Sequence, residues 1–132
     1  MSWETHNSSG SKRVVVTKQL PGDHWLKVLT DADCKVEVGT STDILSVDEI
    51  KSKIGDQCDG VIGQLTERWD DELFSALKAA GGKVYANYAV GYNNVNVDDA
   101  NKHGIPVGNT PGVLTETTAE MAVSLTFSAA RR

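Results

Sequence analysis

The chain has 132 residues, with 13 Lys and Arg against 18 Asp and Glu, a net charge of −5, and 39% hydrophobic residues. This length and composition are typical of one globular domain rather than of a disordered chain. The acidic balance and the scattered basic residues argue against a nucleic-acid or anionic-membrane partner, and no apolar run is long enough to cross a membrane.

The N-terminal segment, residues 1–12, is polar and has no apolar stretch like that of a signal peptide, so we expect a flexible tail on an intracellular protein. Two cysteines follow, Cys34 and Cys58. They lack C-x-x-C spacing and a histidine at metal-ligand spacing. We therefore expect reduced, semi-buried cysteines that take part in packing, and no metal site.

Helical and strand-like segments alternate from residue 13 onward. Runs of β-branched or alternating residues predict strands over 13–17, 34–38, 59–63, 83–89 and 105–108. Amphipathic spacing and capping residues predict helices over 24–32, 46–55, 70–81, 97–103 and 115–132. This alternation predicts an α/β fold, a flavodoxin-like doubly wound five-stranded parallel sheet in the order 2-1-3-4-5.

Two of the helix starts carry specific signals. Ser46 and Glu49 form an S-x-x-E capping box, and Asn96 precedes a short helix that Gly104 closes. In the first helix, residues 25, 28 and 29 share one face and are expected to point inward.

Ligands of such sheets bind outside the carboxyl ends of the strands. The loop over residues 89–93 is the most informative there, because Gly91 follows a strand and carries no Cβ. Consecutive N–H groups in this loop would form a nest for a carboxylate, although an ordinary turn fits the residues as well. His103 and Glu120 are explained by helix dipoles, and the chain contains no G-x-G-x-x-G, P-loop or nucleophile elbow.

Two long motifs give a resemblance to a known family. Residues 88–96 read Y-A-V-G-Y-N-N-V-N, and residues 100–120 read A-N-K-H-G-I-P-V-G-N-T-P-G-V-L-T-E-T-T-A-E. Together with residues 58–66 and 73–82 they make residues 13–132 resemble the D-isomer-specific 2-hydroxyacid dehydrogenases. Within that family the chain is most similar to the plant-type peroxisomal hydroxypyruvate reductases.

The resemblance implies a role for five residues. In that family Val90 and Gly91 would offer backbone N–H groups to the carboxylate of a small 2-oxo acid, hydroxypyruvate or glyoxylate. Gln64 and Leu65 would form the facing wall of the cleft, and Thr118 would approach the nicotinamide of NADH or NADPH. The full-length family member is expected to be a homodimer.

The resemblance also divides the chain. Residues 13–116 match the substrate-binding (catalytic) domain, and residues 117–132 match the start of an interdomain helix. The dinucleotide-binding domain, with the family's arginine, glutamate and histidine, would follow residue 132, so no catalytic residue is assigned. We expect negligible turnover and no strong cofactor binding by this chain alone, and partial exposure of the last helix. Its C-terminal residues carry no peroxisomal address, which favours the cytosol for the chain as written.

Two other functions remain open at this point. The first is a non-catalytic module that binds a small anion or docks on a related subunit. The second is a flavodoxin-like or receiver-like signalling domain, although neither a flavin phosphate loop nor an acidic pocket with a distal lysine is visible. The sequence leaves the choices between NADH and NADPH and between hydroxypyruvate and glyoxylate undecided.

Overall fold

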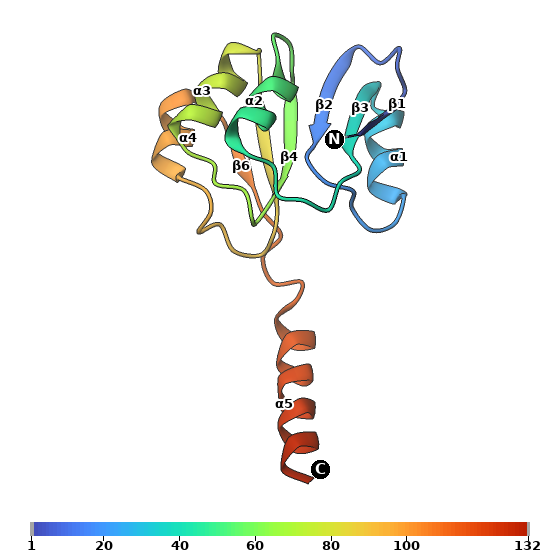
Figure 1. The fold of residues 1–132 in the computed structure, drawn as a ribbon, viewed down its shortest axis with the longest axis vertical. Coiled ribbons are helices and arrows are strands. Elements are labelled where there is room, and N and C mark those ends of the chain that lie inside the picture. The colour runs from blue at the N-terminus through green and yellow to red at the C-terminus, as the bar shows by residue number, and fades with distance from the viewer. Residues whose placement is uncertain (1, 132) are drawn as a thin grey trace.

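The computed structural model describes residues 2–131 and contains a six-stranded mixed sheet with helices on both faces (Figure 1). The strands are β1 Trp3–His6, β2 Lys12–Val16, β3 Cys34–Gly39, β4 Gly60–Gln64, β5 Val84–Tyr88 and β6 Val107–Gly108. The helices are α1 His24–Asp31, α2 Val47–Ile54, α3 Asp71–Ala79, α4 Val97–His103 and α5 Thr115–Arg131. The expected α/β fold is confirmed: β2 to β6 are the five expected strands, all parallel, in the flavodoxin-like order β3-β2-β4-β5-β6.

The sixth strand, β1, lies in the segment expected to be a flexible tail, so that prediction is wrong for residues 3–6. β1 pairs antiparallel with β3, from Trp3 opposite Gly39 to His6 opposite Val36. The Trp3 ring packs against the core, and its centroid lies 4.5 Å from Lys53 Nζ. β1 therefore covers the β3 edge, whose N–H and C=O groups would otherwise lie open.

The two helix caps expected at Ser46 and Asn96 are present. Ser46 Oγ accepts the Glu49 N–H at 3.3 Å, and the Glu49 carboxylate accepts the Ser46 N–H at 2.8 Å, which completes the capping box of α2. Asn96 Oδ1 accepts the N–H groups of Asp98 and Asp99 at the start of α4. These local bonds explain why the helix starts were readable from the sequence.

Neighbouring residues of β2 face opposite sides of the sheet and belong to two different cores. Val15 lies in the larger core under α2, α3 and α4, where the rings of Trp69 and Tyr85 lie 3.9 Å apart between centroids. Val16 lies in the smaller core under α1, with Cys34. Cys34 and the Cys58 of the larger core are free, as expected, and both are buried rather than semi-buried.

Helix α1 covers only one part of its face of the sheet. Trp25, Leu26 and Leu29 pack against the smaller core, whereas Val28, expected to point inward, is 52% exposed. Beside α1, the same face over β4, β5 and β6 is hollowed into an apolar groove of about 570 Å³.

An ionic cluster joins β2, β3 and α2 around the buried Glu37. Its carboxylate oxygens lie 2.7 Å from Arg13 Nη2, 2.7 Å from Lys53 Nζ and 3.0 Å from Lys35 Nζ. Burial opposes the charge of Glu37, but these three hydrogen-bonded cations outweigh it and lower its pKa to about 2.

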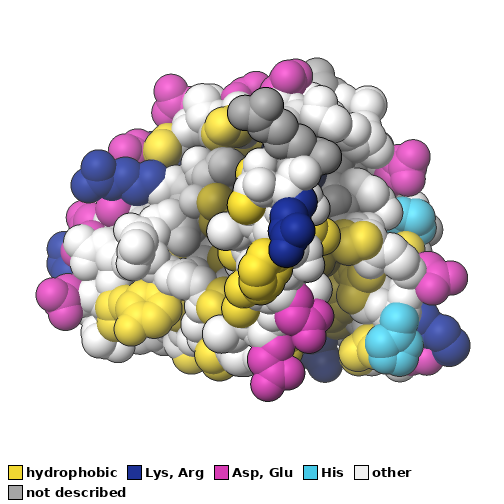
Figure 2. Space-filling view, turned by 90° about the horizontal axis from the view of Figure 1, so that it is seen from below, with side chains coloured by type: hydrophobic (Ala, Val, Ile, Leu, Met, Phe, Trp, Pro, Cys, Tyr) yellow, Lys and Arg dark blue, Asp and Glu magenta, His cyan; other side chains and the backbone are white. Residues whose placement is uncertain are grey.

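Helix α5 extends away from the sheet, and none of its described residues is buried (Figure 1). Viewed from the end toward which α5 points, hydrophobic side chains lie at the centre of the molecule (Figure 2). Met121, Val123, Leu125 and Phe127 are all more than half exposed. The expected exposure of the last helix is therefore confirmed. In the described part of the chain, no helix has the length and hydropathy needed to cross a membrane.

Candidate functional site

The loops that follow β4, β5 and β6 meet at one edge of the sheet, where the carboxyl ends of the parallel strands lie. They form a cleft of about 630 Å³. Gln64 and Leu65 line one wall, and Val90 and Gly91 line another, together with Thr110, Val113 and Leu114. The structure thus brings together all four residues expected to bind substrate. The residues that line the cleft carry no charged side chain, so an anion bound there would depend on dipoles and hydrogen-bond donors.

The carbonyl groups of the loop after β5 are tied to the protein. The Ala89 carbonyl accepts the Thr110 N–H at 2.9 Å, the Val90 carbonyl accepts Asn109 Nδ2–H at 2.8 Å, and the Gly91 carbonyl accepts Asn87 Nδ2–H at 3.0 Å. By contrast, the N–H groups of Val90 and Gly91 donate to no partner within residues 2–131. Two consecutive donors are therefore left over at the wall of the cleft.

Two asparagines, Asn87 and Asn94, hold this loop in place by hydrogen bonds. The carboxamides of Asn87 and Asn94 bond each other reciprocally, with both N···O distances at 3.1 Å. Asn94 Nδ2 also donates to the carbonyls of Gln64 and Glu67, and Asn87 Oδ1 accepts the Tyr85 hydroxyl at 3.0 Å. The pair links the loops after β4 and β5, so one hydrogen-bond network holds both walls of the cleft in place.

A further donor belongs to Gln64. Its Nε2 is buried and has no hydrogen-bond partner among the residues described. The backbone N–H of Gln64 donates to the Glu67 carboxylate at 3.1 Å. Glu67 is only 3% exposed, and its burial raises the pKa of the carboxyl despite the hydrogen bonds that favour its charged form. An unpaired buried donor is unusual, and Gln64 is also one of the residues that line the cleft.

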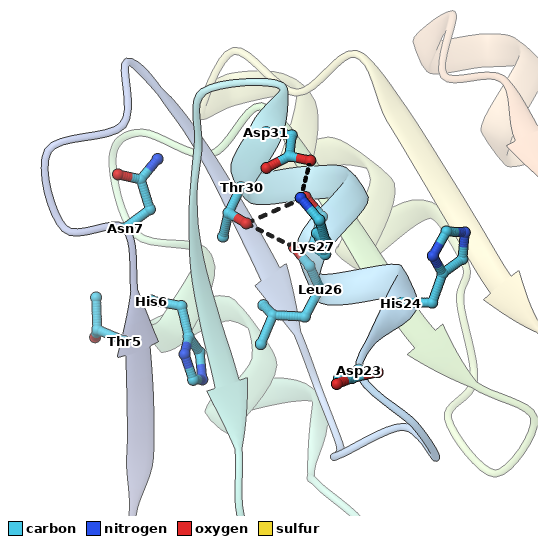
Figure 3. A pocket seen from close by; sticks show the side chains of 9 residues that line it. All are labelled: Thr5, His6, Asn7, Asp23, His24, Leu26, Lys27, Thr30 and Asp31. Carbon is cyan, nitrogen blue, oxygen red and sulfur yellow. Dashed lines mark hydrogen bonds and ion pairs between the residues drawn. The ribbon is translucent and has the colours of Figure 1, made fainter.

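A larger hollow, of about 880 Å³, lies elsewhere, between β1 and α1 (Figure 3). It carries His6 and His24, but these lie on opposite sides of α1, and Lys27 is paired with Asp31 at 2.6 Å. Within residues 2–131, no group of His, Cys, Asp and Glu side chains is arranged to hold a metal ion. This hollow therefore offers no convergent chemistry, and the cleft at the carboxyl edge is the candidate site.

A protein-family match covers nearly the whole chain. The model of the D-isomer specific 2-hydroxyacid dehydrogenase catalytic domain matches residues 14–132. The chain belongs to this family. Its similarity to the glycerate dehydrogenase of Cucumis sativus is 61% identity over 130 residues, 98% of this chain and 34% of the relative. Its similarity to the peroxisomal glycerate dehydrogenase HPR of Arabidopsis thaliana is 60% identity over 133 residues, 100% of this chain and 34% of the relative.

Among solved structures, the TT0316 protein from Thermus thermophilus has the same fold as this chain, with a TM-score of 0.82 and 38% identity. The match covers 91% of this chain and 37% of that one. The chain thus spans about a third of the length of the curated relatives it matches.

Of the expected site residues, Thr118 lies apart from the cleft. It sits on α5, exposed, with its N–H bonded to the Leu114 carbonyl. Conversely, the sequence did not single out Asn87, Asn94 and Asn109. For Asn87 a signal existed, since an asparagine at a buried position of a strand needs hydrogen-bond partners inside the fold.

Proposed function

We propose that this chain is the substrate-binding part of an NAD(P)H-dependent reductase of hydroxypyruvate or glyoxylate, in which Val90 and Gly91 bind the substrate carboxylate. The observation that carries the proposal is the pair of unused N–H groups at the wall of the cleft. The names of the plant relatives support the substrate class, because oxidation of glycerate at its secondary alcohol gives hydroxypyruvate.

The chemistry of the site suits this substrate. Hydride transfer to the 2-oxo carbon needs the carbonyl held in one orientation, and a carboxylate bonded by two adjacent N–H groups fixes the neighbouring carbon. Gln64 also lines the cleft, and a turn of its side chain would bring the unpaired Nε2 donor to a substrate oxygen. In this proposal, the chain binds and orients the 2-oxo acid.

The residues described do not fit the nicotinamide cofactor. The chain has no glycine-rich phosphate loop, and Thr118 stands exposed on α5 away from the cleft. The proposal therefore gives this chain no part in holding the hydride donor. We expect no measurable NADH or NADPH oxidation by the purified chain with hydroxypyruvate, and turnover at an enzyme's ordinary rate would contradict this assignment.

The binding role can be tested at Gly91 with two variants. Both Gly91→Ala and Gly91→Pro add a Cβ, for which the structure has room, but only proline removes the N–H. A charge-assisted hydrogen bond of about 2 kcal/mol predicts that Gly91→Pro binds hydroxypyruvate at least about tenfold more weakly than Gly91→Ala. The measurement is a titration followed by the amide resonances of the labelled chain, with uncharged pyruvamide as the control ligand. Equal affinity of the two variants would contradict a role for this N–H.

A second candidate function rests on α5. Between Glu120 and Arg131 the helix has no charged residue, and its large apolar side chains are exposed. A helix that exposes this many large apolar side chains is normally covered, which supports docking on a related subunit or a homodimer. Light scattering of the purified chain over a range of concentrations tests this: a monomer at all concentrations would argue against it.

The compartment is also a proposal. The name of the Arabidopsis relative places that protein in peroxisomes, and this supports the same compartment for this protein. A fluorescent fusion to the natural gene product would distinguish peroxisomes from cytosol.

A further inference from the structure

Asn109 lies in the loop after β6, next to the proposed carboxylate site but outside the lining of the cleft. Its Nδ2 donates to the Val90 carbonyl at 2.8 Å. Asn109 is half-buried, and this bond crosses from one loop of the carboxyl edge to the next.

The hydrogen bond from Asn109 fixes the orientation of a whole peptide unit, not only of the Val90 carbonyl. A peptide unit is planar, and in the trans form its C=O and N–H point in opposite directions. None of the described peptide bonds is cis. The Val90 carbonyl and the Gly91 N–H belong to one such plane, so an acceptor held on one side directs the donor to the other side.

The partners of the Val90 and Gly91 carbonyls indicate which way these two carbonyls point. Asn109 and Asn87, which bond the carbonyls of Val90 and Gly91, do not line the cleft, whereas Val90 and Gly91 do. The carbonyls therefore turn away from the cleft, and the Gly91 N–H turns toward it.

We propose that Asn109 is a positioning residue of the anion site, whose carboxamide holds the Val90–Gly91 peptide plane so that the Gly91 N–H faces the substrate. The inference rests on the proposed function and deepens it. It separates the two donors of the site: the Val90 N–H belongs to the preceding plane, whose Ala89 carbonyl is held by the backbone N–H of Thr110. Loss of the Asn109 carboxamide should therefore affect Gly91 much more than Val90.

The test uses the labelled 132-residue chain, hydroxypyruvate as the probe and Asn109→Ala as the variant. We expect the apparent Kd to rise at least about fivefold, because one of two charge-assisted donors is no longer oriented. The ligand-induced shift of the Gly91 amide should shrink more than that of Val90. Asn109→Ser, whose shorter side chain keeps a donor, should recover part of the affinity. Asn101→Ala, on the exposed surface of α4, is the matched control and should bind like the unaltered chain.

The outcomes separate the two proposals. If hydroxypyruvate moves neither amide in the unaltered chain, the proposed function fails. If the unaltered chain binds and Asn109→Ala binds equally well, with the same Gly91 shift, the proposed function stands and the role of Asn109 is refuted. A uniform loss at Gly91 and Val90 alike would also refute it, since it would indicate general disturbance of the loop.

Discussion

Replacing Glu37 by Gln removes the carboxylate that Arg13, Lys35 and Lys53 share. The pKa of Glu37 is lowered from 4.5 to about 2, which corresponds to about 3 kcal/mol of unfolding free energy at neutral pH. The unfolded chain takes up the proton first as the pH falls. This contribution is therefore complete above pH 4.5, declines below it, and is lost as the pH falls through about 2.

Urea unfolding of both chains at several pH values measures the effect. At pH 7 we expect the free energy of unfolding of Glu37→Gln to be lower by about 3 kcal/mol. The substitution removes the stabilised carboxylate and leaves three cations without their partner. The difference should narrow to about 1 kcal/mol near pH 3. Glu72→Gln, which removes a surface pair with Lys51, is the control and should change stability far less. A difference between Glu37→Gln and the unaltered chain that stays constant from pH 7 to pH 3 would refute the reasoning.

Three further predictions concern stability. Gly39→Ala should cost about 2 kcal/mol in urea unfolding, because its Cβ would collide with the Thr17 backbone; Gly108→Ala, where the space is open, should cost far less, and equal losses would contradict this. Glu67→Gln should gain stability over the unaltered chain as the pH rises above 4.5, because the raised pKa of Glu67 makes its charged form costly; a parallel pH profile of the two chains would argue against this. Phe127→Ser should shift the thermal midpoint by less than the equivalent of about 0.5 kcal/mol, because Phe127 is 66% exposed, and a large shift would mean that α5 is packed.

The parts of the fold that depend on contacts between residues close in sequence could be predicted from the sequence. The capping box of Ser46 and Glu49 and the Asn96 cap are bonds between residues a few positions apart, and both were predicted correctly. Strand β1 was missed because four alternating residues are a weak signal. β1 is stabilised by its pairing with β3 and by the contacts of Trp3, and both connect residues that are far apart in sequence.

The site divides in the same way. The positions of Gln64, Leu65, Val90 and Gly91 follow from strand order, which brings the carboxyl ends of β4 and β5 together. The hydrogen bond from Asn109 to the Val90 carbonyl depends on the exact approach of two loops, and no residue pattern encodes that approach.

The three tryptophans of the chain lie in three different parts of the molecule. Trp3 reports on the edge strand, Trp25, whose Nε1–H bonds the Gly22 carbonyl, reports on α1, and the fully buried Trp69 reports on the larger core. Each indole thus has a different neighbourhood and a different access to water. Variants that keep one tryptophan at a time would turn fluorescence into a region-by-region record of unfolding, and would reveal whether the edge strand detaches before the core melts.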